Sequence, residues 1–156
     1  MIVTATEPDG PQIVDITARV GVFSAEEVDC VDTIFREYLD YGPGDSGYNF
    51  IVDKDGDRVL GFACYGLRDL THGVADLYWI AVDPDVHRGG VGRRLLEASE
   101  DAMRADGGRM IIAETSGTAA YDATREFYLR TGYVMEATIK DFYKEGDDLA
   151  IFVKRL

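Results

Sequence analysis

The pattern of apolar and polar positions is clearest in the middle of the chain, from residue 76 to residue 116. Leu77 to Val82 is almost entirely apolar and is followed by Asp83-Pro84, which predicts a buried strand that ends where proline removes a hydrogen-bond donor. Val91 to Met103 carries apolar residues at helical spacing with charged residues between them, which predicts an amphipathic helix. Because a second apolar run follows at Met110 to Ala113, the pattern predicts two parallel strands joined by a right-handed crossover.

The rest of the chain divides into shorter elements. Gln12 to Val20 has apolar residues in partial alternation, which predicts a first strand. Ser24 with Glu27 forms a capping-box pattern, which predicts a helix of about four turns, with a loop after it at Asp40 to Tyr48. Further strands are expected at residues 48–52, 58–67, 133–139 and 149–154, a helix at 122–131, and connecting loops at 68–73 and 141–148, with residues 1–11 as a loose or edge segment. The order β-α-β-β-β-α-β-α-β-β predicts a mixed α/β fold, in which a mixed, twisted sheet of about seven strands has helices on both faces.

Length and composition limit the classes of protein that fit. The chain has 156 residues and is 46% hydrophobic, which predicts one globular domain over residues 1–156. The first dozen residues include an aspartate, a glutamate and two prolines, and no apolar run approaches the length of a membrane span. We therefore expect a cytoplasmic protein without a signal peptide. Cys30 and Cys64 have no CxxC or histidine-rich spacing around them, so we expect two core thiols and neither a disulfide nor a metal.

The net charge of −13 limits the classes of molecule that the chain is expected to bind. Nucleic acids and anionic membranes bind basic surfaces, so we expect neither of them as a partner. An acidic protein suits a cationic acceptor such as an amine, although the same charge also serves solubility alone. The sequence leaves the oligomeric state open, and it is compatible with a homodimer.

A glycine-rich turn, His87 to Gly92, lies between the central strand and the helix, with three glycines in four residues. Glycines let the backbone approach a bulky anion, and the free N–H groups and positive dipole end of the following helix favour its binding. A nucleotide-hydrolase loop is excluded because Arg93-Arg94 follows the last glycine, and a dinucleotide fingerprint is excluded because Leu95 stands where its third glycine belongs. The turn therefore predicts a pyrophosphate site, with a purely structural turn as the alternative.

This turn resembles the signature of the GNAT superfamily of acetyl-CoA-dependent N-acetyltransferases, which has Gln or Arg, two residues, Gly, one residue, and Gly or Ala. Gly90 and Gly92 match the glycine positions, and His87 stands at the first position. Together with the sequence IAVDP before the turn, the resemblance extends from about Val59 to Tyr133. It implies a GNAT-like fold and acetyl-CoA as the co-substrate. The residues that it implies in coenzyme binding are Ile80, Ala81 and Val82 for the pantetheine arm, and His87, Arg88, Gly89, Gly90, Val91, Gly92 and Arg93 for the pyrophosphate.

Acetyl transfer needs a neutral amine, although an alkyl ammonium has a pKa near ~10.4, and a proton donor for the departing thiolate, whose pKa is about 8.5. By the resemblance, Glu114 matches the strand-end glutamate that many GNAT members use, directly or through water, to deprotonate the amine. Tyr128, in the sequence FYLRTGY, matches the helix tyrosine that protonates the thiolate. Many members have Asn at the place of Tyr121. The alternatives are that Glu114 caps a helix or pairs with an arginine, and that Tyr128 only packs in the core.

The acceptor side has its own candidates. Asp76 and Tyr78 lie on the central strand beside Trp79, and Tyr143 lies in the loop that by the resemblance would overhang the acceptor pocket. We expect acetyl transfer to the primary amine of a small molecule, such as an amino acid or a related metabolite, by direct attack in a ternary complex. The alternatives are a protein N-terminus or lysine as the acceptor, and a coenzyme A-binding regulatory domain without turnover.

Overall fold

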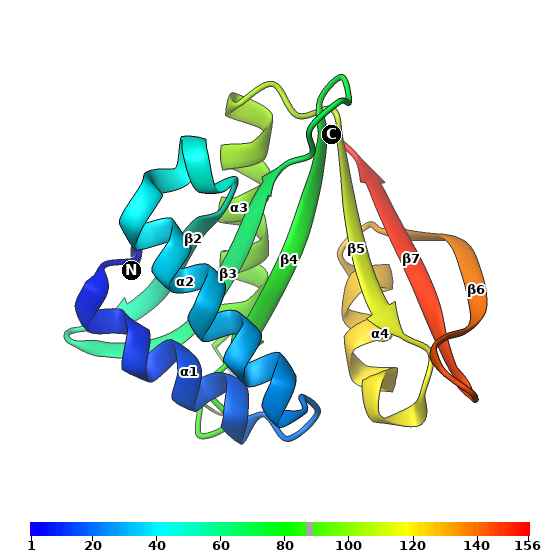
Figure 1. The fold of residues 1–156 in the computed structure, drawn as a ribbon, viewed down its shortest axis with the longest axis horizontal. Helices are drawn as coiled ribbons and strands as arrows, with labels where there is room; N and C mark the ends of the chain where they lie inside the picture. Colours follow the sequence, from blue (N-terminus) through cyan, green and yellow to red (C-terminus); the bar gives the residue numbers. More distant parts are fainter. Residues whose placement is uncertain (87–88) are drawn as a thin grey trace.

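The computed structural model, which describes residues 1–86 and 89–156, has a seven-stranded mixed sheet with helices on both faces (Figure 1). This confirms the predicted fold class. The elements are β1 (Ile2–Thr4), α1 (Gly10–Arg19), α2 (Ala25–Ser46), β2 (Asn49–Asp55), β3 (Arg58–Leu67), β4 (Val74–Val82), α3 (Val91–Ala105), β5 (Met110–Ser116), α4 (Asp122–Arg130), β6 (Val134–Lys144) and β7 (Asp147–Arg155), with short 3-10 turns η1 (Glu7–Asp9) and η2 (Ala119–Tyr121). The strand order is β1-β2-β3-β4-β5-β7-β6. In the described part of the chain, no helix is both long and apolar enough to cross a membrane.

β4 and β5 pair over a short length and then diverge. Val74 to Asp76 pair in parallel with Met110 to Ile112, and beyond these residues the two strands separate toward their carboxyl ends (Figure 1). On its other side β4 stays paired with β3 as far as Val82. The register between β3 and β4 shifts at Tyr78, and such a bulge bends and twists its strand. We call the space between residues 77–82 of β4 and residues 113–116 of β5 the splay.

The two faces of the sheet carry separate apolar clusters. Figure 1 shows α1 and α2 on one face and α3 and α4 on the other. Phe50 and Phe62 are fully buried in the cluster under α1 and α2, and Leu95 and Phe152 are fully buried in the cluster under α3 and α4. Because successive strand residues point to opposite faces, the central strands contribute side chains to both clusters.

The predicted first strand at residues 12–20 is wrong, because these residues form most of α1. Ile13 and Ile16 are buried at helical spacing, and the hydroxyl of Thr17 donates to the carbonyl of Ile13 at 2.8 Å. The apolar positions of this segment fit the period of a helix as well as that of a strand, and Pro11 in the first turn favours a helix start. The strand that the sequence prediction lacked is β1, which lies in the predicted loose or edge segment and pairs with β2 at the border of the sheet.

The predicted loop at residues 40–48 is largely helical. α2 continues through this segment, and Gly42, with φ of 74°, and Pro43 interrupt it without ending it. Glycine and proline indicated a loop where they produce only a kink.

The same helix carries Cys30, which is exposed and not the core residue we expected, whereas Cys64 is buried in β3.

The predicted loop at residues 141–148 is the turn of a hairpin. β6 runs to Lys144 and β7 starts at Asp147, so only two residues connect them. Asp141 has φ of 54°, and the register between the two strands shifts on this side of the hairpin. Tyr143 therefore lies on a strand and not in a loop. All residues of β6 are exposed, as expected of an edge strand.

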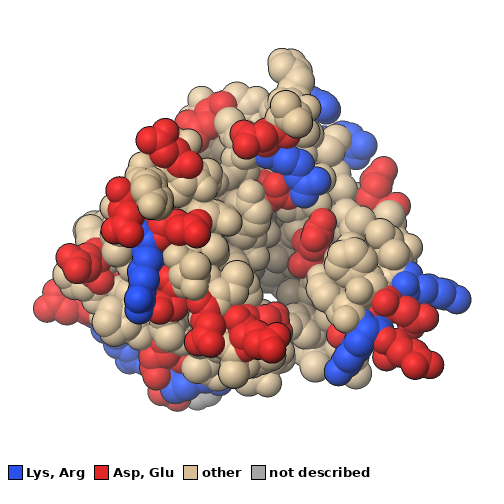
Figure 2. All heavy atoms as spheres, in the orientation of Figure 1, with Lys and Arg blue, Asp and Glu red and all other residues tan. Residues whose placement is uncertain are grey.

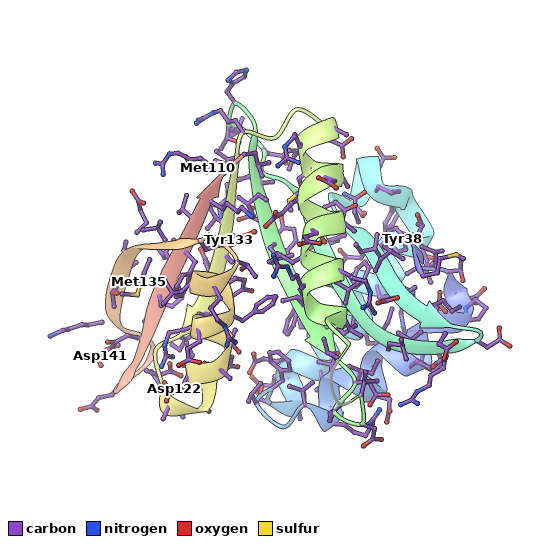
Figure 3. All side chains as sticks on the ribbon, turned by 180° about the vertical axis from the view of Figure 1, so that it is seen from behind. Tyr38, Met110, Asp122, Tyr133, Met135 and Asp141 are labelled. Atoms are coloured by element: carbon purple, nitrogen blue, oxygen red, sulfur yellow. The ribbon has the colours of Figure 1, made fainter. Side chains whose placement is uncertain are left out.

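A buried carboxylate joins α3 to the second half of the sheet. Glu100 accepts hydrogen bonds from the ammonium of Lys154 at 2.9 and 2.8 Å and from the hydroxyl of Tyr133 at 3.1 Å. Burial, and then the Glu100 carboxylate, raise the pKa of Tyr133, so its phenol stays protonated and donates. Figure 3 shows Tyr133 on the face covered by α3 and α4. This contact holds α3 against β7 on the far side of β5.

Replacing Glu100 with alanine should lower the free energy of unfolding by about 3 kcal/mol, because the partly buried ammonium of Lys154 would lose its counterion. Urea denaturation measures this change. Asp101→Asn is the matched control on the same helix, since Asp101 is exposed and pairs with Arg104 at 2.8 Å, so it should change stability little. Equal losses in the two variants would contradict the role given to Glu100.

Candidate active site

α3 begins at the glycine turn and presents free main-chain donors. Gly90 precedes the helix with φ of 66°, a conformation that glycine adopts readily. The first helical hydrogen bond runs from the N–H of Arg94 to the carbonyl of Gly90 at 2.9 Å. The N–H groups of Val91, Gly92 and Arg93 therefore have no acceptor within the helix. Together with the positive end of the helix dipole, these donors form a site for an anion.

A cavity of about 420 Å³ opens beside these donors, between the end of β4, the start of α3 and α4. Its lining residues are Val82, Val86, Gly90, Val91, Gly92, Arg93, Phe127, Arg130 and Thr131. The cavity thus brings together Val82 and residues 90–93 of the predicted coenzyme site. The predicted residues His87 and Arg88 lie outside the described part of the chain. The cavity and the helix start fit a diphosphate, because the free N–H groups lie at the cavity wall. Gly92, which has no side chain, leaves this wall open.

Three lining residues from α4 and its C-cap were missed by the sequence analysis. Phe127, Arg130 and Thr131 face the cavity across from the start of α3. Their spacing of three and four residues places them on one face of the helix, which is the signal that could have indicated them. Arg130 adds a second cationic side chain to a wall that already carries Arg93.

The main chain of Ile80, Ala81 and Val82 is paired on one side only. These residues pair with residues 61–63 of β3, whereas within the described residues β5 pairs with β4 no further than Asp76. The N–H and C=O groups that point from this part of β4 into the splay are therefore free to bind an extended ligand, as they would bind another strand. The amides of a pantetheine arm are groups of this kind.

Tyr128 lies on α4 at the apolar wall of the splay. It is 5% exposed, and its ring lies 5.3 Å from that of Tyr133 and 5.4 Å from that of Phe152. Burial raises the pKa of Tyr128, so its phenol stays protonated. Within the described residues, the hydroxyls of Tyr38, Tyr121 and Tyr133 donate to oxygen atoms of the protein, whereas that of Tyr128 has no such partner. Its proton is therefore available to a ligand.

Glu114 lies on β5, two residues beyond the last residue that pairs with β4. Its neighbour Ala113 belongs to the apolar cluster under α3 and α4, so strand alternation directs Glu114 to the opposite face, where it is exposed. Tyr128 belongs to the same cluster as Ala113. The predicted base and the predicted acid therefore lie on opposite faces of the sheet, with the splay between them.

The two predicted acceptor residues of β4 have different surroundings. Asp76 is 7% exposed, and both of its oxygens accept hydrogen bonds from the guanidinium of Arg68, at 2.9 and 2.5 Å. Tyr78 is 41% exposed, and its ring lies 5.4 Å from that of Tyr48. Burial, followed by the Asp76 carboxylate, raises the pKa of Tyr78 to about 12. Tyr78 thus presents a neutral phenol to the acceptor side, whereas Asp76 is held in an ion pair.

Carboxylates from three elements act on one tyrosine, Tyr143 of β6. Burial first, and then Glu114, Asp147 and Glu27, raise the pKa of Tyr143. Burial, followed by Glu27, raises the pKa of Tyr121 to about 12. Such effects weaken with distance, so the three carboxylates lie near these tyrosines. We call Glu114, Asp147 and Glu27 the acidic rim. Figure 2 shows a hollow near the middle of the face covered by α1 and α2, with acidic side chains along its border. The sequence analysis missed Glu27 and Asp147, which it assigned to a helix cap and a loop.

An aromatic bridge crosses the wide end of the splay. The hydroxyl of Tyr121 donates to the carbonyl of Val22 at 3.2 Å. The ring of Phe23 lies 6.5 Å from that of Tyr121 and 5.1 Å from that of Trp79, and both contacts are edge-to-face. Trp79, Phe23 and Tyr121, which we call the aromatic bridge, thus join β4 and the connection before α2 to the turn η2 that follows β5.

Comparisons with known proteins agree with this geometry. The model of the acetyltransferase (GNAT) family matches residues 17–133. A protein from Desulfovibrio desulfuricans assigned to the GNAT acetyltransferases superimposes with a TM-score of 0.95 and 37% identity over 99% of this chain and 98% of that one. The ribosomal-protein-alanine N-acetyltransferase of Brucella melitensis has a TM-score of 0.80 and 23% identity, covering 100% and 99% of the two chains. The S-(2-succino)cysteine N-acetyltransferase of Bacillus subtilis (strain 168) is 24% identical in an alignment of 141 residues that covers 83% of this chain and 81% of that protein.

The family match and the site support each other. The matched residues include the glycine turn, both strands of the splay and all of α4. The resemblance found in the turn and the predicted enzyme class are therefore confirmed. The chain belongs to the GNAT family and is an N-acetyltransferase that uses acetyl-CoA.

Proposed function

We propose that this chain transfers the acetyl group of acetyl-CoA to the primary amine of a small molecule, with residues 1–156 acting as one domain. The observation that supports a small acceptor most directly is the aromatic bridge, which closes the wide end of the splay beside the acidic rim. A closed border limits the length of the acceptor that can lie across the site. A cytoplasmic location and a homodimer stay predictions from the sequence.

The relatives leave the acceptor open, because their names include both a modified amino acid and a ribosomal protein. A protein acceptor is the second candidate, and it would need an open groove for an extended peptide. Tyr143 of β6 lies near Glu114 at another border of the splay, which favours the small acceptor. The acidic rim favours an acceptor with positive charge, such as the ammonium form of an amine.

The donor side is built mostly from main-chain groups. The N–H groups of Val91, Gly92 and Arg93 bind the diphosphate, and the free edge of β4 at Ile80 to Val82 binds the pantetheine amides. Acetyl-CoA held in this way supplies the acetyl group as a thioester. These contacts direct the thioester into the splay, between Tyr128 on one face and Glu114 on the other.

The side chains of the splay divide the proton transfers between them. Glu114 accepts a proton from the acceptor ammonium, directly or through water, and the neutral nitrogen then forms its bond to the thioester carbon. Tyr78 has no register partner in β3, and a main-chain N–H at this bulge donates to the carbonyl oxygen as it gains negative charge. As the carbon–sulfur bond breaks, Tyr128 donates its proton to the thiolate, because burial has kept its phenol protonated. The nitrogen gives up its second proton through water to the Tyr128 phenolate, which leaves a neutral amide and restores the acid.

Incubating the protein with acetyl-CoA and a panel of amines should release free thiol with small primary amines and much less with peptides. The panel should include a tertiary amine of similar size as a control, since it cannot form an amide. Thiol release at background with every acceptor, together with saturable coenzyme binding, would show a regulatory coenzyme-binding domain. Faster acetylation of peptides than of small amines would mean that the acceptor class is wrong.

Glu114→Gln should lower kcat/KM by about 10²-fold, and most strongly at low pH, where the amine is most protonated and needs a base. The measurement is the pH–rate profile. Glu27→Gln is the matched control, since it removes a carboxylate of the acidic rim from a different element. It should raise the KM for the amine and leave the shape of the profile unchanged. An unchanged profile in Glu114→Gln would remove this residue from the role of base.

Tyr128→Phe should lower kcat by about 10²-fold with little change in coenzyme affinity, because the ring packing is kept and the proton donor is lost. Tyr133→Phe is the control in the adjacent ring, whose hydroxyl bonds Glu100 at 3.1 Å. That variant should lose stability and keep its turnover. A loss of coenzyme binding alone in Tyr128→Phe would identify Tyr128 as a packing residue.

A further inference from the structure

The adjacent residues Arg93 and Arg94 at the start of α3 have different partners. Arg93 lines the cavity, and its guanidinium donates to the exposed carboxylate of Glu97 at 2.9 Å. Arg94 is directed toward β2, where its Nε and Nη2 donate to Oδ2 of Asp53 at 2.9 and 2.5 Å. Its Nη1 donates to the carbonyl oxygen of Gly89. One guanidinium thus connects a strand to the glycine turn.

Asp53 gives Arg94 a fixed anchor. Its carboxylate is 1% exposed, and its other oxygen accepts from the amino group of Met1 at 2.8 Å. Burial alone would raise the pKa of Asp53, but the hydrogen bonds from Met1 and Arg94 outweigh it and lower the pKa below its ordinary value. A buried charge that is paired in this way cannot move without losing its partners. The guanidinium of Arg94 is therefore held in place from the side of the sheet.

The glycine turn needs such a constraint. Gly89 has φ of 114° and Gly90 has φ of 66°, and two successive glycines have more accessible backbone conformations than any other pair. The hydrogen bond from Arg94 fixes the direction of the Gly89 carbonyl. Because the C=O and N–H of a trans peptide point in opposite directions, the N–H of Gly90 is then directed away from Arg94. Gly90 lines the cavity, so this orientation suits donation to a ligand there.

We infer that Arg94 is a positioning residue for the coenzyme diphosphate: anchored on Asp53, it holds the Gly89–Gly90 peptide in its binding orientation and does not itself contact the phosphate. This inference rests on the proposed function, because it concerns the same donor site. It separates the two arginines of the turn by role. Arg93 is available to the ligand, whereas Arg94 acts through the backbone.

Direct phosphate contact by Arg94 and positioning of the turn by Arg94 predict different acetyl-CoA affinities for Asp53→Asn. If Arg94 contacted the phosphate, Asp53→Asn would release it toward the ligand, and affinity for acetyl-CoA would be unchanged or higher. If Arg94 positions the turn, Asp53→Asn, Arg94→Gln and the double variant should each bind acetyl-CoA about tenfold more weakly, because all three lose the same connection. The kcat at saturating acetyl-CoA should stay within about twofold of the parent, since no reacting group is removed.

Isothermal titration with acetyl-CoA measures the affinities, and S-acetylpantetheine, which lacks the diphosphate, is the second probe. The variants should bind S-acetylpantetheine as the parent does, whereas a general disturbance of the site would weaken both ligands. The affinity of Arg94→Gln for acetyl-CoA should also keep the salt dependence of the parent, because no phosphate contact is lost. This variant alone suffices if Asp53→Asn does not fold, since Arg94 is 46% exposed.

Lys54→Gln is the matched control on the same strand. Lys54 pairs with the buried carboxylate of Asp9 at 2.7 Å, so this variant removes a comparable ion pair on the side of η1. It should lower stability and leave acetyl-CoA affinity unchanged. The inference is overturned if Arg94→Gln binds acetyl-CoA as tightly as the parent, or if Asp53→Asn does so while Arg94→Gln is weaker. Absence of saturable acetyl-CoA binding by the parent would instead contradict the proposed function.

Discussion

The short parallel pairing of β4 and β5 is the constraint on which the site depends. Within the described residues, β4 and β5 pair only through residues 74–76 and 110–112, while β3 holds β4 from its outer side over residues 75–82, apart from the bulge at Tyr78, and β7 holds all of β5. The strands can therefore diverge without unravelling the sheet. Main-chain groups left free in a splay are costly unless a ligand or water satisfies them, so the same feature that opens the sheet also prepares it to bind an extended amide chain. The Glu100 contact ties α3 to Lys154 of β7, beside the paired part of β5, and the aromatic bridge crosses the wide end of the splay.

The acidic residues of the chain serve two different purposes. Some are buried and paired with cations, and they fix the segments around the coenzyme site. Asp53 does so through Arg94, and Asp83, before the glycine turn, accepts from Arg19 and Arg58 at 3.0 and 2.9 Å. Burial opposes ionisation of Asp83, but the hydrogen bond from the main-chain N–H of Asp85 at 3.0 Å, together with these contacts, lowers its pKa to about 2. The carboxylates of the acidic rim lie near the proposed acceptor side, so the net charge of −13 reflects both the scaffold and the proposed site.

The sequence was most informative where a segment carries its own periodicity. The central strand and α3 were predicted with nearly the observed bounds, because burial on both faces and helical spacing each leave a local signal. The strand prediction for residues 12–20 was wrong because their apolar positions fit both the strand period and the helical period. The acidic rim, the aromatic bridge and the different directions of Arg93 and Arg94 could not be predicted, since each depends on residues far apart in the chain. Arg94 and Asp53 are 41 positions apart, and Tyr121 and Val22 are 99 apart.

The aromatic bridge turns the open end of the splay into a passage with an entrance on each face of the molecule. The coenzyme cavity lies beside α3 and α4, and the acidic hollow lies on the side of α1 and α2 (Figure 2). Under the proposed function, donor and acceptor thus arrive from opposite directions and meet only at the reacting atoms. The free thiol and the amide can then depart through separate exits, so neither product has to wait for the other to clear its route.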